Sequence, residues 1–385
     1  MVYLSKLVLR NLFRHKLRTM LTLAGLVVAI VSFGLLQTVV TAWYNNANMA
    51  SATRLVTRNA ISLVFPLPLS YRQKIRGIDG VRAIAYANWF GAIYKEPKNF
   101  FPQFAVDDAY LSLFPEFVVS EAERHDFQRD RKGCILGRKI ADAFGIKLGD
   151  NLTLKGTIFP GDWTFVVRGI YTGASNKTDL SQMFFHWDYL NETVRKRYAR
   201  RVDQVGFYII EAGNADDMAR IAIDIDMQFK NSTAETLTET EKAFQLGFVS
   251  MTESIVVSIR LVSYLVIFII MAVMANTMAM TARERLGEYA TLKALGFGPG
   301  FLATTILGES LLLATLGGAA SIALTFPLAV EFSKHTGTLF PVFQVAQETV
   351  LLQCACAVGI GVLAALMPIR RALSVNIVEG LRSIG

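Results

Sequence analysis

The chain has 385 residues, 52% of them hydrophobic, and a formal net charge of +8. Its mean hydropathy of +0.38 is higher than soluble globular domains usually reach, so membrane-spanning segments are the first expectation. The positive charge fits nucleic-acid binding, but the cytoplasmic flanks of membrane helices also collect Lys and Arg. We favour the second interpretation and predict no nucleic-acid partner. Three cysteines show neither zinc-ligand spacing nor a disulfide framework, and Cys134 is expected to be a buried thiol.

Residues 1–18 are basic and contain no acidic residue. At helical spacing they form one basic and one apolar stripe: Lys6, Arg10 and Arg14, and Leu4, Val8 and Leu12. This pattern is typical of an amphipathic helix that lies on the cytoplasmic face of a membrane. A basic segment that only orients the following helix fits the same residues. We favour the surface helix.

Four apolar runs are long enough to cross a bilayer at about 1.5 Å per residue. The first, 19–42, is uncharged and longer than the roughly 7–15 apolar residues of a signal-peptide core, so a retained transmembrane helix is predicted rather than a cleaved signal. The others are 251–282, whose first part extends outside the membrane, 301–330 and 349–369. Small residues four apart predict close helix packing: Ala314 and Gly318, Gly317 and Ser321, and Ala357, Gly361 and Ala365.

One carboxylate interrupts the third run. Glu309 would cost about 3 kcal/mol near mid-membrane, whereas the Leu, Ile, Phe and Val residues of the run favour insertion by roughly 4–7 kcal/mol. The helix is therefore expected to insert, with Glu309 and Ser310 as polar residues embedded in the membrane. Glu309 lies within about two turns of one end of the run. We hypothesise that it pairs there with a basic residue such as Arg285 or Arg370.

The basic flanks of the four runs predict the orientation of the chain. Segments 1–18, 283–298 and 370–385 carry Lys and Arg clusters, and four spans place all three on one face. The positive-inside rule assigns that face to the cytoplasm. Both termini are then cytoplasmic, with 370–385 as a tail. The loop 331–348 and the stretch 43–250 lie outside.

Residues 43–250 change from long apolar runs to short elements separated by turns, which predicts a mixed α+β domain inserted between the first two spans. Its aromatic residues Trp89, Phe90, Phe100 and Phe101 either fill the core, which we expect, or face a bound substrate. The predicted elements are a helix followed by a strand at 70–94, a strand–helix–strand unit at 133–156, strands at 163–171 and 205–212, and a helix at 215–229.

The sequence contains few groups that could perform catalysis. It has no G-x-S-x-G, no HExxH and no paired-carboxylate constellation, and four histidines leave little for a metal site. A Gly-rich phosphate cradle is also missing. We predict a non-enzymatic chain without cofactor or metal. If ATP drives the protein, another chain must bind it.

The charged segment 283–298 (RERLGEYATLKALGFG) lies between the second and third spans and predicts a short helix closed by Gly296 and Gly298. On a helical wheel Leu286, Tyr289 and Ala290 share one side, while Leu292 and Leu295 take another near Glu284 and Glu288. A helix that is apolar on two sides fits a wedge held between the membrane bundle and a partner. An ordinary interfacial helix, with one apolar face, is the alternative.

The charged segment and the ESLLLATLGG that follows at 309–318 resemble the FtsX-like permeases of ABC transporters, which include the macrolide-exporter and lipoprotein-release types. Arg283-Glu284, Glu288, Leu292-Lys293-Ala294-Leu295-Gly296 and Glu309-Ser310 occupy the positions of the family pattern. Residues 8–25, 133–156 and 367–385 resemble further family segments, with Ile377 and Gly380 as minor departures.

The resemblance implies an α-helical membrane protein with four transmembrane helices and an extracytoplasmic α+β domain between the first and second. It also implies a second permease subunit, identical or paralogous, a cytoplasmic ABC ATPase dimer that binds ATP and Mg, and in some members a periplasmic adaptor. Segment 283–298 would be the coupling helix in the ATPase groove. The residues that the resemblance assigns to it are Glu284, Arg285, Glu288, Tyr289, Leu292, Lys293 and Leu295.

In the function that the resemblance implies, the second span transmits ATP-driven movement to the external domain, and it has no Pro or Gly between Arg260 and Arg283 to bend it. The expected activity is export or extraction of a lipoprotein, lipid, peptide or drug at a bacterial inner membrane. Activation of a cell-wall hydrolase by the same movement is the alternative within the family. A membrane-anchored receptor or enzyme without an ATPase is the alternative outside it.

Overall fold

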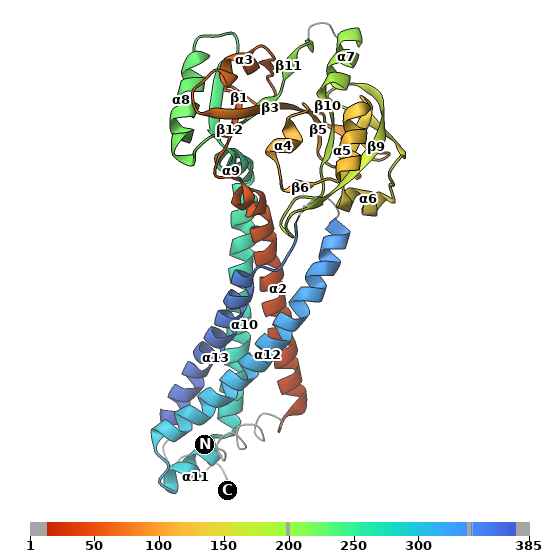
Figure 1. The fold of residues 1–385 in the computed structure, drawn as a ribbon. Coiled ribbons are helices and arrows are strands. Elements are labelled where there is room, and N and C mark those ends of the chain that lie inside the picture. Colours follow the sequence, from red (N-terminus) through yellow and green to blue (C-terminus); the bar gives the residue numbers. More distant parts are fainter. Residues whose placement is uncertain (1–13, 198–200, 337–339, 341, 375–385) are drawn as a thin grey trace. The chain divides into compact units, whose positions relative to one another are not determined.

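The computed structural model of the chain describes residues 14–197, 201–336, 340 and 342–374. The chain divides into a helical unit and an α+β unit (Figure 1). The helical unit comprises Met1–Thr41, Glu253–His335 and Phe343–Gly385, and the α+β unit Ala42–Thr252 and Thr336–Val342.

Four long apolar helices and an α+β domain are present, as predicted. The helices are α2 (Lys16–Met49), α10 (Glu253–Glu284), α12 (Pro299–Thr336) and α13 (Gln347–Ser374), and all four are long and apolar enough to cross a membrane. Three of them extend past both ends of the predicted run, because helical hydrogen bonding continues into polar residues that a bilayer core would exclude. Most of the predicted amphipathic helix at 1–18 and of the tail at 370–385 lies outside the described residues, as does part of the loop 331–348.

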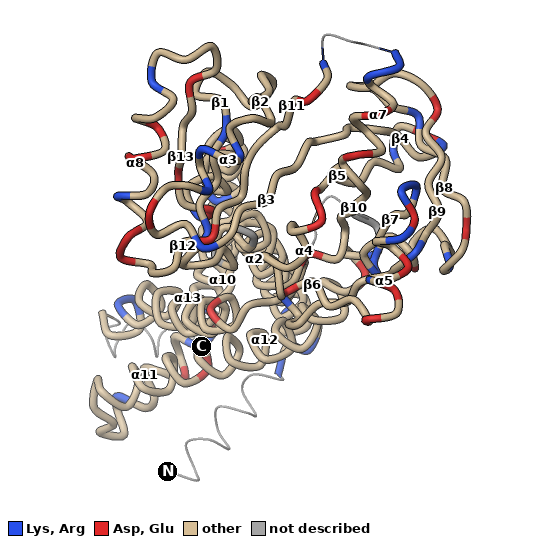
Figure 2. The backbone as a smooth tube through the Cα atoms, turned by 45° about the horizontal axis from the view of Figure 1, so that its top comes forward, with Lys and Arg blue, Asp and Glu red and all other residues tan. Residues whose placement is uncertain are grey.

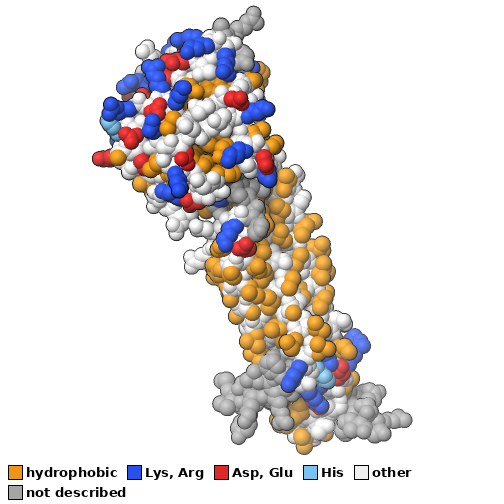
Figure 3. All heavy atoms as spheres, turned by 90° about the vertical axis from the view of Figure 1, so that its right-hand side faces the viewer, with side chains coloured by type: hydrophobic (Ala, Val, Ile, Leu, Met, Phe, Trp, Pro, Cys, Tyr) orange, Lys and Arg blue, Asp and Glu red, His pale blue; other side chains and the backbone are white. Residues whose placement is uncertain are grey.

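Small residues bring α12 and α13 together, as their spacing predicted. A Cβ placed on Gly318 would lie 2.7 Å from the Cβ of Ala357, and one on Gly361 would lie 2.8 Å from that of Ala314. Both contacts are too close for larger side chains, so the two backbones approach tightly. Apolar side chains cover the face of the long helices that Figure 3 shows, and charged side chains gather at one end.

The α+β unit contains a large mixed sheet with the strand order β13-β1-β12-β3-β5-β10-β7-β9-β8-β4, in which β6 also pairs with β9. Strands β5 and β10 pair in parallel, as do β7 and β9. The strands of this sheet are β1 (Arg54–Asn59), β3 (Val81–Trp89), β4 (Ala92–Ile93), β5 (Gln103–Val106), β6 (Phe117–Val118), β7 (Gly133–Gly137), β8 (Asn151–Gly156), β9 (Gly161–Gly173), β10 (Met183–His186), β12 (Phe207–Ala212) and β13 (Thr236–Thr240). A separate pair joins β2 (Leu67–Pro68) to β11 (Gln204–Val205).

The helices of this unit lie between the strands in the chain, except for α9, which follows β13. They are α3 (Tyr71–Arg76), α4 (Tyr110–Leu113), α5 (Glu121–Arg129), α6 (Arg138–Phe144), α7 (Trp187–Arg197), η2 (Ala215–Asp217), α8 (Met218–Gln228) and α9 (Glu241–Met251). The predicted strand–helix–strand unit at 133–156 is confirmed as β7, α6 and β8. Gly145 ends α6 with φ +65°, a conformation that glycine adopts without strain, and its N–H donates to Ala141 O. Charged residues of both signs are frequent on this unit and sparse along α10, α12 and α13 (Figure 2).

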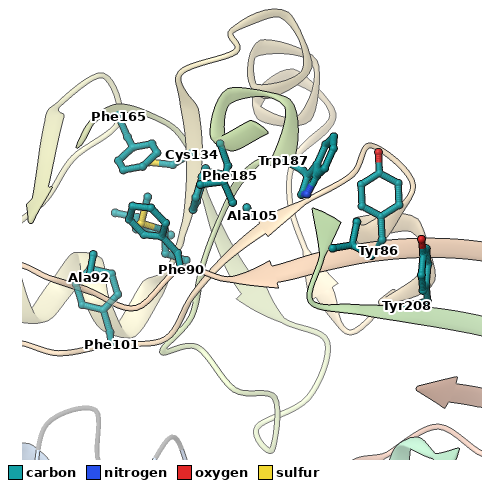
Figure 4. Packing of buried hydrophobic residues seen from close by; sticks show 14 of the residues in the cluster. Tyr86, Phe90, Ala92, Phe101, Ala105, Cys134, Phe165, Phe185, Trp187 and Tyr208 are labelled. Carbon is teal, nitrogen blue, oxygen red and sulfur yellow. The ribbon is translucent and has the colours of Figure 1, made fainter. Parts of the chain in front are cut away.

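The two faces of the sheet carry separate hydrophobic cores. Leu55, Ala105 and Cys134 belong to one cluster, and their chain neighbours Val56, Val106 and Ile135 belong to the other. This alternation follows from the period of two along a strand. Aromatic rings such as Phe90, Phe165 and Phe185 fill the first core (Figure 4). Cys134 is a buried thiol, as predicted, and burial raises its pKa.

The four aromatic residues expected in the core divide into two pairs. Phe90 and Phe101 are fully buried, whereas Trp89 and Phe100 each keep 40% of their surface exposed. Neighbours along an extended chain point in opposite directions, so Trp89–Phe90 and Phe100–Phe101 each place one ring in the core and one at the surface.

Arg54, the first residue of β1, joins three parts of the α+β unit. Its guanidinium donates to the carboxylates of Glu241 at 2.7 and 3.3 Å and Glu116 at 2.5 and 3.1 Å, and to Leu113 O at 2.7 Å. Burial opposes its charge, but the hydrogen bonds with Glu116 and Glu241 raise the pKa of Arg54 above its usual value. The network connects β1, which follows α2 in the chain, to α9, which precedes α10.

Candidate functional site

The charged segment between the second and third long helices forms the end of α10 and a separate short helix, α11 (Leu286–Ala294). Arg285 is the residue between the two helices, with φ −106° and ψ 13°. Its carbonyl accepts the first α11 hydrogen bond, from Tyr289 N at 3.0 Å. The segment predicted as one helix at 283–298 is therefore divided at Arg285.

Gly296 closes α11, as the sequence predicted. Its φ is +89°, its N–H donates to Lys293 O, and the N–H of Phe297 donates to Leu292 O, both at 3.0 Å. This pair of bonds is the Schellman arrangement, in which a left-handed residue satisfies the last carbonyls of a helix.

Replacing Gly296 with alanine is expected to weaken this turn by about 1 kcal/mol, because a Cβ disfavours positive φ. Hydrogen exchange of the Phe297 amide should then be about fivefold faster. Gly298→Ala is the matched control, since Gly298 has open space around its Cα and no positive φ. Equal exchange in the two variants would contradict the assignment.

A buried ion pair connects α11 to α12. Arg285 Nη1 donates to the two carboxylate oxygens of Glu309 at 2.7 and 3.0 Å, and the two side chains are 10% and 6% exposed. Of the two partners proposed for Glu309, Arg285 is the one that the structure brings to it. The Nε–H of Arg285 also donates to Glu288 at 2.9 Å, and the Arg285 guanidinium lies 5.4 Å from the ring centroid of Tyr289. Ser310 donates to Gly361 O at 2.6 Å and so links α12 to α13.

Two side chains of this cluster, Arg285 and Glu288, have pKa values that are shifted toward their charged forms. Burial opposes the charge of Arg285, but the Glu309 carboxylate, Tyr289 and the hydrogen bonds with Glu309 and Glu288 raise the pKa of Arg285 above its usual value. Burial also opposes the charge of Glu288, but its hydrogen bonds with Arg285 and Arg14 hold the pKa of that carboxyl below its usual value. In both residues the hydrogen bonds and charges of the cluster outweigh burial and favour the charged form.

Further polar contacts join this region to α2 and α13. Arg14 bonds to Glu288, and Arg18 donates to both carboxylate oxygens of Glu284 at 2.8 and 3.0 Å. Lys293 Nζ donates to Leu373 O of α13 at 2.9 Å. These pairs are more exposed than Arg285–Glu309, and each adds little free energy. Together with the Arg285–Glu309 pair they connect the α10–α11 segment to α2, α12 and α13.

The residues predicted for the coupling helix divide by exposure. Tyr289 is 2% exposed, and it and Arg285 face the bundle, with Leu286 and Leu292 partly buried against the same core. Leu295 is 71% exposed, and Glu284 and Glu288 are exposed as well, while Lys293 is half-buried.

The structure adds Phe297, 42% exposed, to the outward surface. Sequence reasoning missed it, although its position between Gly296 and Gly298, in a turn with no core to fill, was a usable signal. We call the exposed residues 295–300, which include Leu295 and Phe297, the apical turn.

Metal ligands do not gather at one place in the described ranges. Within them, no group of three or more His, Cys, Asp and Glu side chains is placed to hold a metal ion. His186 is buried against the Phe127 ring, and its Nε2 is 2.8 Å from Phe127 O. It packs as a core residue.

Four long apolar helices, with an α+β domain between the first and second in the chain, define the class as a multi-spanning membrane protein. A family model described as MacB-like periplasmic core domain matches residues 19–227, and one described as FtsX-like permease C-terminal matches residues 260–377. The chain belongs to the FtsX-like, MacB-type family of ABC transporter permeases.

Individual relatives are distant. An uncharacterized ABC transporter permease of Methanocaldococcus jannaschii, MJ1507, is 23% identical and aligns over 97% of this chain and 96% of its own length. The solved extracellular domain of the ABC-type transporter YknZ from Gram-positive bacteria is 12% identical, with a TM-score of 0.35 over 49% of this chain and 100% of that domain. A domain described as part of a permease from Porphyromonas gingivalis is 11% identical, with a TM-score of 0.30 over 48% and 86%.

Proposed function

We propose that this chain couples ATP hydrolysis by a separate cytoplasmic ATPase dimer to movement of its α+β domain on the other side of the cytoplasmic membrane. The observation that supports this most directly is the bonding of the α10–α11 segment. Arg285, Glu284, Glu288 and Lys293 tie it to α12, α2 and α13, so a force applied to α11 would reach all four long helices.

The apical turn is the proposed contact with the ATPase. Leu295 and Phe297 are exposed apolar side chains at the end of a helix that is otherwise anchored in its bundle. A few side chains that enter desolvated pockets of a partner commonly supply most of the binding energy of an interface. Tyr289 and Arg285 would act indirectly, by holding α11 in place.

The remaining parts of the proposal follow from the family and the charge pattern. The Lys and Arg flanks support cytoplasmic termini and a cytoplasmic α11. The uninterrupted helical core of α10 supports its role as the element that transmits displacement. A second permease subunit completes the assembly, and the substrate is a lipoprotein, lipid, peptide or drug taken from the periplasm or from the outer leaflet of the inner membrane.

Co-purification tests the contact. The double variant Leu295→Asp/Phe297→Asp is expected to reduce the ATPase recovered with the tagged full-length chain by about tenfold or more, because two apolar anchors are replaced by charges. Ile223→Asp is the matched control, since Ile223 is 62% exposed on α8 and lies outside the apical turn. Full recovery of an ATPase with the double variant would refute the proposed contact.

A further inference from the structure

Gln353 is a fully buried amide of α13 that bonds to two neighbouring helices. Its Nε2 donates to Ile30 O of α2 at 3.0 Å and to Thr325 Oγ1 of α12 at 2.9 Å. A Cβ on Gly34 of α2 would overlap the amide, so only glycine fits beside it. Because a carbonyl oxygen can only accept, the bond to Ile30 identifies the nitrogen end of the amide. The other end, Oε1, is therefore directed away from α2.

Three buried oxygen atoms of the long helices have no hydrogen-bond partner within the described part of the chain: Gln353 Oε1, Thr349 Oγ1 and Ser263 Oγ. Each of these residues is at most 1% exposed. A buried hydroxyl in a helix usually donates to the carbonyl four residues earlier, as Thr38 and Thr325 do at 2.7 and 2.8 Å. Since nearly all buried polar atoms in proteins bond to protein or to water, the three oxygens indicate a ligand.

Thr349 and Gln353 lie on the same buried side of α13. They are four residues apart, so their side chains are neighbours one turn from each other. Side chains in a helix lean toward its N-terminus, which carries the Gln353 amide back over the turn of Thr349. The two oxygens therefore belong to one place in the bundle.

Ser263 lies at the same height on α10, which packs directly against α13 (Figure 1). Two contacts align α10 with the antiparallel helix α2: Arg18 with Thr281, and Gly25 with Ile270. The residue numbers of these pairs total 299 and 295, so Ser263 is level with about residues 32–36 of α2. That turn contains Gly34, the residue beside the Gln353 amide. All three oxygens thus meet at one level of the helical unit.

The chemistry of the three atoms identifies the ligand. An amide oxygen only accepts hydrogen bonds, whereas each hydroxyl can donate and accept. A water molecule donates two bonds and accepts two, and a buried water typically makes about three bonds to protein. Hard metal cations take six or more oxygen ligands, often carboxylates, and these three oxygens belong to uncharged side chains. One water satisfies the set, and a metal ion does not.

We propose that one water molecule binds inside the helical unit, donating to Gln353 Oε1 and sharing hydrogen bonds with the hydroxyls of Thr349 and Ser263. The water connects α13 to α10 at the level where Gln353 connects α13 to α2 and α12. The site thereby joins all four long helices. This inference goes beyond the proposed function and holds whether or not an ATPase binds α11.

The variant Thr349→Val tests the site, because valine keeps the shape of threonine and removes only the hydroxyl. The equilibrium constant for unfolding of the full-length chain in mixed micelles is expected to rise about fivefold, the usual effect of losing one hydrogen bond. A buried hydroxyl without a partner gives the opposite result, since its removal leaves the constant unchanged or lowers it. Either of those outcomes would overturn the proposal.

A double variant tests whether the two hydroxyls share one water. Ser263→Ala alone is expected to raise the unfolding constant about fivefold, and Thr349→Val/Ser263→Ala less than about tenfold, because both changes act on the same molecule. Thr305→Val is the matched control, since Thr305 is buried on α12 and donates to Phe301 O at 2.8 Å. Its effect should multiply with that of Thr349→Val. Multiplication of the Thr349 and Ser263 effects as well would refute a shared site.

A crystal structure of the full-length chain identifies the ligand directly. At about 2 Å resolution one water peak is expected within about 2.7–3.2 Å of the three oxygens. A direct hydrogen bond from the Thr349 hydroxyl to Gln353 Oε1, with no peak beside them, would contradict the proposal. Replacing Na⁺ by choline in the unfolding experiment should leave the constant unchanged. A constant that depends on Na⁺ would identify an ion in place of water.

Discussion

Arg285→Met is expected to lower the free energy of unfolding of the helical unit by about 3–5 kcal/mol, because the buried Glu309 carboxylate loses the cation that compensates its burial. Methionine keeps much of the apolar stem of arginine, so the effect reports the guanidinium rather than lost volume. The measurement is an unfolding titration of the purified full-length chain in mixed micelles, followed by helical circular dichroism.

Two comparisons make the expectation specific. Arg14→Met removes an exposed ion pair, since the side chains of Arg14 and Glu288 are 60% and 42% exposed. It should lower the free energy of unfolding by less than about 1 kcal/mol. The double variant Arg285→Met/Glu309→Leu removes both charges and should recover much of the stability lost in the single variant. If Arg285→Met costs no more than Arg14→Met, or if the double variant is the least stable of the three, the pair does not hold α11 to α12.

The same double variant separates folding from coupling. With both charges removed, α11 would still pack through Tyr289 and Leu286, but its charge-assisted bond to α12 would be gone. On the proposed function, the ATPase would still be recovered through the apical turn, while the link between α11 and α12 would be weaker. Arg285 is therefore a positioning residue in this scheme and not a contact residue.

Local sequence patterns were sufficient to predict much of the fold. Uncharged runs predicted the four long helices, and glycines at fixed offsets predicted the strand–helix–strand unit at 133–156 and the end of α11. The pairing of Glu309 with Arg285 was also accessible, because a carboxylate in an apolar run needs a cation and the nearest ones lie in the connecting segment.

Tertiary packing decided the rest of the site. A helical wheel shows that α11 has two apolar sides but cannot tell which one the bundle covers. Tyr289 and, in part, Leu292 turned inward, while Leu295 remained outside. The bonds from Arg14 and Arg18 to α10 and α11 join residues more than 260 positions apart, and no local pattern encodes such a contact. The break at Arg285 has no capping side chain that would have marked it.

Arg54→Leu is expected to open the junction of β1, α9 and the segment before β6. The change leaves two carboxylates, Glu116 and Glu241, next to each other without the guanidinium between them, and removes the donor to Leu113 O. Breaking a buried network of this kind costs about 3–5 kcal/mol. Hydrogen exchange in the full-length chain should therefore become at least about 100-fold faster at the β1 and β13 amides, while the amides of α10 are unaffected.

Arg58 on the same strand is the matched control. Its single pair with Glu239, at 3.0 Å with side chains 21% and 25% exposed, predicts an effect of Arg58→Leu below about 1 kcal/mol. Arg54→Lys should fall between the two, since an ammonium keeps the charge but cannot span both carboxylates and the carbonyl. Exchange rates in Arg54→Leu that match those in Arg58→Leu would show that β1 and α9 are held together by the sheet alone. In that case Arg54 would not be what makes β1, which follows α2, and α9, which precedes α10, move together.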